Sequence, residues 1–209
     1  MTEAAPTRQR LLDAGLRLFA ERGFDATSVG DIEAAVGLQP RRGALYKHFP
    51  SKQALLEAAV HAHLDDAESV ASQIADLDLS TALDANPSLL RPMITALGRW
   101  FLDEMDRLED LTRLFEHDAH RLASLAAEAK TNLVDLSYRT AATLLRAVRP
   151  DIEDPEALAV IILGSLVAVR RTVWTYRSSP LNIDDDRVLS TWTTHTLAAL
   201  DVSGEVAPV

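Results

Sequence analysis

The stretch from Thr27 to Lys52, TSVGDIEAAVGLQPRRGALYKHFPSK, determines how the rest of the chain is interpreted. Its first two residues carry hydroxyls that can cap a helix N-terminus, and apolar residues then continue at helical spacing until Gly37. After a glycine-bearing turn, Pro40 suits the first position of a short helix over Arg41 to Phe49. Two short helices separated by such a turn predict a helix-turn-helix.

Charge is distributed unevenly along the chain. The net formal charge is −10 over 209 residues, but residues 1–52 carry a net charge of +2 and residues 53–209 carry −12. Between residues 41 and 52 there is no acid, and the basic residues of this segment are Arg41, Arg42, Lys47 and Lys52. A local basic surface on an otherwise acidic protein is compatible with nucleic-acid binding by one end of the molecule.

The composition indicates a folded protein of the reducing cell interior. The chain is 47% hydrophobic, which is sufficient for a core, and it has no cysteine, which excludes disulfides and thiolate metal sites. The longest apolar run, 157–169, is shorter than the roughly 20 residues that span a bilayer. The N-terminal MTEAAPTRQR lacks the apolar centre of a signal peptide, so we expect a cytoplasmic location.

Helical spacing recurs throughout, and no segment alternates as a strand does, so we expect an all-α fold of about nine helices. The expected segments are 6–22, 27–37, 41–49, 51–74, one entered at Pro87 or Pro92, 109–115, 117–148, 155–177 and 184–200. We divide the chain into a head, residues 1–52, and a body, residues 53–209, joined by the helix over 51–74. Residues 76–88 are rich in turn formers and predict a connector.

Two blocks of the head carry a family resemblance. ERGFDATSVGDIEAAVG followed by GALYKHFPSKQALL resembles the DNA-binding head of TetR-type one-component transcriptional regulators, over about 50 of the 209 residues. The resemblance implies a homodimeric regulator, most often a repressor, that binds a palindromic operator on double-stranded DNA. It further implies that the helical body dimerises and binds a small-molecule effector that releases the DNA.

The chain departs from the family pattern at one point. Five residues, LQPRR, separate Gly37 from Gly43, which is a two-residue insertion relative to the family. Base contacts therefore do not transfer position by position through residues 38–42. Tyr46, Lys47, His48 and Lys52 lie beyond the insertion and match positions that contact phosphate in the family.

The chemistry of these side chains assigns expected roles at the DNA. Arginine reads guanine best because its fork meets O6 and N7 together, so Arg41 and Arg42 are the expected base readers. Gly43 would allow close approach, and a helix N-terminus with free amides favours an anion. The complete expected DNA-binding set is Thr27, Ser28, Arg41, Arg42, Gly43, Tyr46, Lys47, His48 and Lys52. The alternative is a solvated basic turn on an ordinary helical head.

The body has no motif of its own, but it carries aromatic, sulfur-bearing and basic residues on three expected helices. Such a set can line an effector pocket for a partly apolar molecule, or it can be ordinary core. The candidates are Trp100, Phe101, Met105, Phe115, Tyr138, Arg139, Arg170, Trp174 and Tyr176. The helix over 155–177 is apolar almost all round in its first half, so we expect it to form a dimer interface with the last helix, or else to be the central helix of a monomer.

A competing hypothesis is a helical-bundle enzyme or ligand carrier whose head does not bind DNA. Glu116, His117 and His120 are close enough in sequence to suggest a metal, but a third ligand of the right kind is not identified. The sequence has no glycine-rich phosphate loop and no nucleophile elbow. We therefore expect no catalytic residues, no metal and no cofactor.

Overall fold

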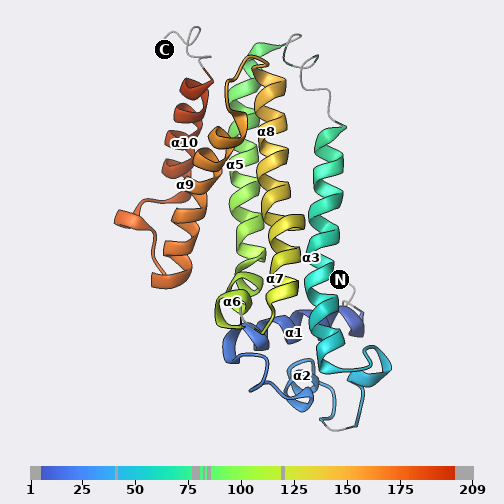
Figure 1. The fold of residues 1–209 in the computed structure, drawn as a ribbon. Coiled ribbons are helices and arrows are strands. Elements are labelled where there is room, and N and C mark those ends of the chain that lie inside the picture. The colour runs from blue at the N-terminus through green and yellow to red at the C-terminus, as the bar shows by residue number, and fades with distance from the viewer. Residues whose placement is uncertain are drawn as a thin grey trace. The chain divides into compact units, whose positions relative to one another are not determined.

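The computed structural model describes residues 6–40, 42–76, 81, 83, 86–118 and 121–200, which form helices and turns (Figure 1). These described residues contain no strand, and the all-α prediction is confirmed. The chain divides into two compact units: the first unit comprises Met1–Ser69 with Leu108–Val134, and the second comprises Val70–Arg107 with Asp135–Val209. The functional division at residue 52 stays a prediction, since compactness does not test which residues bind DNA.

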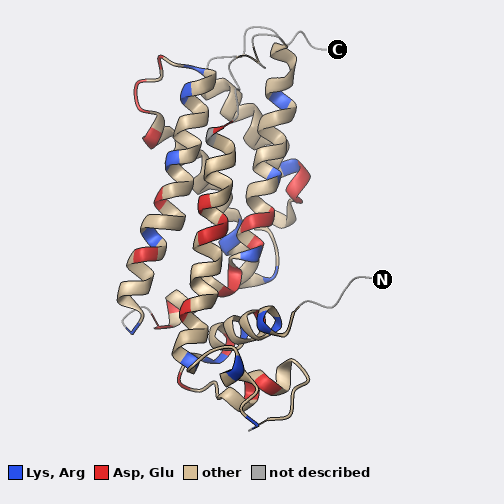
Figure 2. Cartoon of the chain, turned by 90° about the vertical axis from the view of Figure 1, so that its right-hand side faces the viewer, with Lys and Arg blue, Asp and Glu red and all other residues tan. Residues whose placement is uncertain are grey.

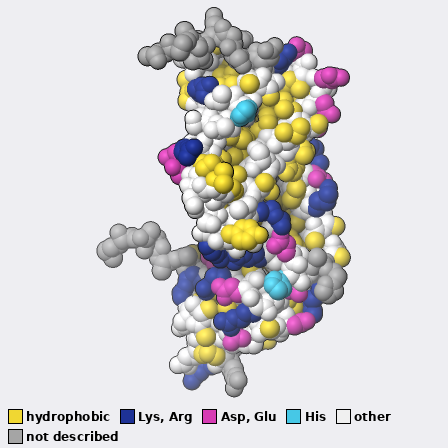
Figure 3. All heavy atoms as spheres, turned by 90° about the vertical axis from the view of Figure 1, so that its left-hand side faces the viewer, with side chains coloured by type: hydrophobic (Ala, Val, Ile, Leu, Met, Phe, Trp, Pro, Cys, Tyr) yellow, Lys and Arg dark blue, Asp and Glu magenta, His cyan; other side chains and the backbone are white. Residues whose placement is uncertain are grey.

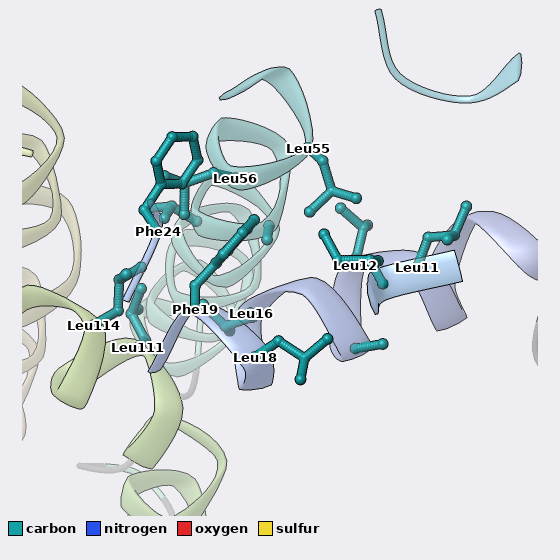
Figure 4. Close-up of a cluster of buried hydrophobic side chains, with 14 of the residues drawn as sticks. Leu11, Leu12, Leu16, Leu18, Phe19, Phe24, Leu55, Leu56, Leu111 and Leu114 are labelled. Carbon is teal, nitrogen blue, oxygen red and sulfur yellow. The ribbon is translucent and has the colours of Figure 1, made fainter. Parts of the chain in front are cut away.

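The first unit is built around a leucine-rich core. Its helices are α1 (Thr7–Arg22), α2 (Val29–Ala35), the 3-10 turn η1 (Leu45–Lys47), α3 (Lys52–Ala75, as far as Ser69), α6 (Glu109–Asp118) and α7 (Ala123–Ala129). Phe19 of α1 is fully buried, and Leu55 of α3 and Leu111 of α6 belong to the same cluster (Figure 4). This core fixes how α1, α3 and α6 pack, and α2 joins it through the fully buried Ile32.

The second unit is a separate bundle. Its elements are η2 (Pro87–Leu89), α5 (Leu90–Arg107), α8 (Leu136–Val148), α9 (Pro155–Tyr176), η4 (Pro180–Asn182) and α10 (Asp185–Ala199). Leu102, Leu166 and Leu189 bring α5, α9 and α10 together in one buried cluster. At Gly98 of α5, a Cβ atom would lie 2.7 Å from the Trp192 ring of α10, so glycine is what permits the close approach of these two helices.

Several helix starts lie where local chemistry predicts them. The Ser51 hydroxyl accepts a hydrogen bond from the Ala54 amide at 3.0 Å, at the start of α3. Asp154 accepts from the Ala157 amide at 2.9 Å before α9, and Asp184 caps α10 in the same way. The cap supplies an acceptor to an amide that has no helical partner, which is why it can be located from sequence.

The third predicted helix, Arg41 to Phe49, is wrong. Among its described residues only η1 is helical, a single 3-10 turn, and Gly43 has a φ of +69°, which no right-handed helix contains. In a helix that began at residue 41, the Leu45 amide would donate to the carbonyl of that residue. It donates instead to Glu33 Oε1 at 3.0 Å, so a tertiary hydrogen bond replaces the helical one.

The long helix predicted over 117–148 is also corrected. α6 continues to Asp118, whose carbonyl accepts from the amides of both Arg121 and Leu122, and α7 begins at Ala123. From there the chain is helical to Val148, but Lys130–Asp135 is a π-helical segment between α7 and α8. A π-helical turn accommodates an additional residue, a feature that side-chain periodicity does not reveal.

α9 is the most apolar helix of the second unit. It has 22 residues, and by length and composition it could cross a membrane, although an apolar helix of a soluble protein passes the same test. Only 28% of its most apolar window is buried within this single chain. Much of the apolar surface of α9 is therefore exposed in the single chain, and part of it lines a groove together with α10.

Candidate nucleic-acid interface

α2 begins with a complete capping box. The Ser28 hydroxyl accepts from the Asp31 amide at 3.1 Å, and Asp31 Oδ2 accepts from the Ser28 amide at 2.9 Å. Hydrogen bonds from the Ser28 hydroxyl and amide lower the pKa of Asp31 below its ordinary value. The sequence predicted that free amides at this helix start would bind a phosphate. The Ser28 amide is instead bonded to the Asp31 carboxylate, although Ser28 itself is exposed.

Thr27 does not face solvent. Its side chain is fully buried, and its hydroxyl lies 3.1 Å from the Leu18 carbonyl and 3.0 Å from the Gly23 carbonyl, to which it can donate. A phosphate contact requires an accessible donor, so the structure assigns this hydroxyl to fixing the α1–α2 turn. We name the residues of that turn, Gly23–Thr27, the Phe24 turn.

The segment Leu45–Phe49, which contains η1, has a buried side chain at each end and exposed side chains between them. Leu45 is fully buried and Phe49 nearly so, whereas Tyr46 is 57% exposed and Lys47 and His48 are exposed. The buried pair packs the turn against the first unit's core, and the three polar residues between them remain exposed. Because all three are exposed, they are accessible for the expected contacts with DNA phosphates.

Glu33 of α2 positions η1. Its side chain is fully buried, and its carboxylate accepts from the Leu45 amide at 3.0 Å, twelve residues further along the chain. Sequence reasoning missed this residue. A usable signal was present, because Glu33 lies between Ile32 and Val36 on the apolar side of a short helix, where an acid has to find a partner.

We name residues 37–43, which lie between α2 and η1, the insertion segment. Gly37 and Gly43 have φ angles of +75° and +69°, which suit glycine and explain why both ends of this segment carry it. Arg42 is exposed, in keeping with a base reader, and Gly43 is half-buried. Arg41 lies outside the described residues. The basic residues of this unit are blue in Figure 2.

Lys52 is half-buried at the start of α3, and its ammonium group contacts the Phe24 turn. It donates to the carbonyls of Phe24 and Thr27, at 2.6 and 2.8 Å. Sequence reasoning placed Lys52 among the phosphate contacts, whereas these bonds use two of its three donors inside the protein.

The predicted effector residues do not form one group. Phe115 packs against the core of the first unit, while the others belong to the second unit, where Trp100 is 37% exposed and Arg139 is exposed. Arg170 is buried and forms a bidentate pair with Asp185, at 2.8 and 3.2 Å, and a further contact with Asp106. The indole of Trp174 donates to the same Asp106 at 3.2 Å.

These contacts join α5, α9 and α10 through a polar network in the second unit. Arg170 and Trp174 therefore have partners within the chain, a role that the sequence did not reveal. His117 is exposed and His120 lies outside the described residues, and over the part of the chain that is described no three potential metal ligands cluster.

α9 and α10 form an apolar groove on the second unit, with a volume of about 490 Å³. Hydrophobic side chains gather on this face (Figure 3). The groove is lined from α9 by Leu158, Ile161, Ile162, Leu166 and Val169, and from α10 by residues that include Val188 and Trp192. Ile161 is 69% exposed and Val160 is 52% exposed. None of the predicted effector residues lines it.

Comparison with known proteins agrees with the geometry of the first unit. Residues 11–59 match the family described as bacterial regulatory proteins, tetR family, and this segment contains α2, the insertion segment and η1. Residues 11–59 therefore resemble the DNA-binding segment of that family. The match covers the helix-turn-helix region, where the exposed Arg42, Tyr46, Lys47 and His48 lie.

Named relatives of the matched segment are transcriptional regulators. The regulator UidR of Escherichia coli K12 is 44% identical over 59 residues, which are 28% of this chain and 29% of UidR. The repressor KstR2 of Rhodococcus jostii RHA1 is 46% identical over 59 residues, 28% of each protein. The matched segment thus spans less than a third of either relative.

Solved structures resemble the fold over most of the chain. A TetR-like regulator from Rhodococcus sp. RHA1 superposes with a TM-score of 0.63 and 21% identity, covering 98% of this chain and all of that one. GusR of Salmonella enterica has a TM-score of 0.58 and 25% identity, with coverages of 96% and 98%. The likeness in the second unit is therefore one of fold.

Proposed function

We propose that this protein is a TetR-type homodimeric transcriptional regulator, in the first instance a repressor, that binds a palindromic operator through its first unit. The observation that carries the proposal is the exposed set Arg42, Tyr46, Lys47 and His48, which the buried Leu45 and Glu33 hold next to α2 within the segment that matches the family. Side chains of this kind read base edges and bind phosphates.

The apolar groove of α9 and α10 supports a second copy of the chain as the partner. Ile161, an isoleucine that is 69% exposed in the first third of a 22-residue apolar helix, is costly in water, and a two-fold contact would bury it. A two-fold dimer presents two heads related by symmetry, which is why the operator is expected to be palindromic.

A small, partly apolar effector bound by the second unit would release the DNA. Release requires the effector to bind the DNA-free conformation more tightly than the DNA-bound one. The aromatic residues of α5 and α8 that are only half-buried, Phe101 and Tyr138, remain candidates for that site. A protein with this activity works in the cytoplasm, where the chromosomal DNA of a bacterium is found.

Selection of genomic fragments tests DNA binding directly. Fragments retained by the purified protein at physiological salt are sequenced, and the expected result is enrichment of one palindrome. Fluorescence anisotropy then measures its affinity for wild-type protein and for Lys47→Ala, which should bind more weakly and with a smaller salt dependence. If no palindrome is enriched, the repressor proposal is overturned.

The dimer is tested by size-exclusion chromatography with light scattering. Ile161→Glu places a charge in the groove and should yield a monomer at concentrations of about 10 µM, because an unpaired buried charge is strongly disfavoured. Leu89→Glu is the matched control, since Leu89 is an exposed leucine outside the groove, and this variant should remain dimeric. A wild-type protein that is monomeric would refute the proposed interface.

A further inference from the structure

Charged side chains from two other elements hold both backbone groups of Phe24. Its amide donates to Asp118 Oδ2 at 3.0 Å, and Asp118 is the last residue of α6. Its carbonyl accepts from Lys52 Nζ at 2.6 Å, and Lys52 is the first residue of α3. Hydrogen bonds with an ionised partner are stronger than neutral ones, so the backbone of this turn is fixed from two sides.

The aromatic ring of Phe24 receives two cations as well. Lys52 Nζ lies 4.2 Å from the ring centroid and the Arg121 guanidinium carbon lies 5.0 Å from it, both within the range of a cation–π contact. Arg121 also forms an ion pair with Asp25, the next residue of the turn. The ring itself is buried and packs on Phe19 of α1, at 5.1 Å between centroids.

The Lys52 ammonium group is poorly placed to bind phosphate. Two of its donors are bonded to the carbonyls of Phe24 and Thr27, and the group is half-buried. Burial lowers its pKa below the ordinary value, against the charge of Asp25, which raises it, and with a further lowering from Arg121. Leaving these partners for a phosphate would cost the hydrogen bonds that hold the turn.

We propose that Lys52, Asp118 and Arg121 are positioning residues for DNA binding, which act by clamping the Phe24 turn and thereby setting the direction of α2, and that Lys52 does not contact phosphate. The turn ends at Thr27, whose carbonyl is one of the two that Lys52 binds, and Ser28, the cap of α2, follows immediately. A shift of the turn therefore moves the start of α2. The proposal rests on the DNA-binding function proposed above.

The salt dependence of operator binding separates positioning from phosphate contact. Each phosphate neutralised by a lysine contributes about 0.9 to the slope of log K against log salt concentration. Lys47→Met, the matched control with an exposed lysine, should lower the slope by about one. Lys52→Met should weaken binding by about tenfold, the size expected for a lost charge-assisted hydrogen bond, with the slope unchanged. A slope lowered as in Lys47→Met, or an unchanged affinity, overturns the role of Lys52.

A pair of variants tests Asp118, the acid among the three residues that hold the Phe24 turn. Asp118→Ala should weaken operator binding, and Asp118→Asn should restore much of the affinity because its amide oxygen still accepts from the Phe24 amide. Asp66→Ala, which removes an exposed acid of α3 in the same unit, controls for the change in net charge. Equal affinities for wild type and Asp118→Ala would show that Asp118 does not position the turn.

Amide exchange measures the clamp without DNA. The Phe24 amide proton should exchange about tenfold faster or more in Asp118→Ala, and stay close to the wild-type rate in Asp66→Ala. Should Lys52→Met fail to fold, Lys52→Arg keeps the charge and the donors and should retain both affinity and slope. If wild type binds no palindrome, the proposed function fails, whereas an unchanged Phe24 exchange rate in Asp118→Ala refutes the clamp itself.

Discussion

The two connections that flank α2 differ in how far their functional residues are buried. The Phe24 turn, before α2, buries Phe24 and Thr27 and is held by Lys52, Asp118 and the Thr27 hydroxyl, so the polar groups of these two residues are bonded inside the protein. The insertion segment, after α2, exposes Arg42 to solvent. A DNA-binding head needs both, because a side chain that reads bases is useful only if the segment that carries it is held in place.

Charge alone does not tell which residues contact DNA. Lys52 and Lys47 are five residues apart and belong to the same basic segment, yet one ammonium group is bonded to two carbonyls and the other is exposed. The difference arises from what lies beside each of them in the fold. Variants on the two sides of α2 should therefore differ in kind. Those of the buried side should change stability, and operator affinity at an unchanged salt slope, whereas those of the exposed side should change base discrimination or the salt slope.

The largest effect is expected at Glu33, which connects the two sides. Glu33→Ala removes a fully buried carboxylate and leaves the Leu45 amide without its acceptor, at a cost of about 3 kcal/mol in the free energy of unfolding. Glu33→Gln keeps an oxygen acceptor and should lose less than half as much. Urea unfolding followed by circular dichroism measures both values. Equal losses in the two variants would mean that the hydrogen bond to Leu45 is not what stabilises η1.

Arg42 tests the role of the exposed segment after α2. Arg42→Ala should leave the unfolding free energy unchanged within about 0.5 kcal/mol, because the side chain is exposed. Its operator affinity should fall, and the discrimination at one base pair should decrease by about 2 kcal/mol. Competition among single-base operator variants measures that discrimination. An equal loss of affinity for every sequence would identify Arg42 as a phosphate contact instead of a reader.

Local signals in the sequence predicted most helices, whereas tertiary contacts altered the site. Ser51, Asp154 and Asp184 cap helices through bonds to amides three residues away, and such bonds depend only on neighbouring residues. The third helix failed because the Leu45 amide bonds to a residue twelve positions earlier. No periodicity within residues 41–49 contains that information.

The same distinction explains the predicted DNA contacts. A threonine before a helix can either cap it or bond to a distant carbonyl, and Thr27 does the second while Ser28 does the first. A lysine in a basic segment can bind either a phosphate or a carbonyl. Sequence specifies the donor in each case, but the acceptor becomes known only once α1 and α3 are packed.

Thr27 provides a smaller test of the buried side. Thr27→Val keeps the shape of the side chain and removes the hydroxyl, which should destabilise the protein by about 1–2 kcal/mol because the Leu18 and Gly23 carbonyls lose the single donor that they share. Thr27→Ser keeps the hydroxyl and should lose less. Thermal unfolding measures both, and the salt slope of operator binding should be the same in both variants. A loss of operator affinity without a loss of stability in Thr27→Val would place this hydroxyl at a phosphate after all.

The smallest effect is expected from Asp31, whose pKa is lowered by the hydrogen bonds from Ser28. Because the folded pKa is below the unfolded one, the ionised carboxylate stabilises the fold above the ordinary pKa of 3.8, and this contribution disappears as the pH falls through the folded pKa. Asp31→Asn should therefore be less stable than wild type at pH 7 and pH 5, and the difference should narrow at pH 3. Urea unfolding at the three pH values measures it, and Asp66→Asn controls for charge. If the stability difference between wild type and Asp31→Asn stayed the same at pH 3, it would come from the geometry of the helix cap. The charge of the Asp31 carboxylate would then not stabilise the capping box.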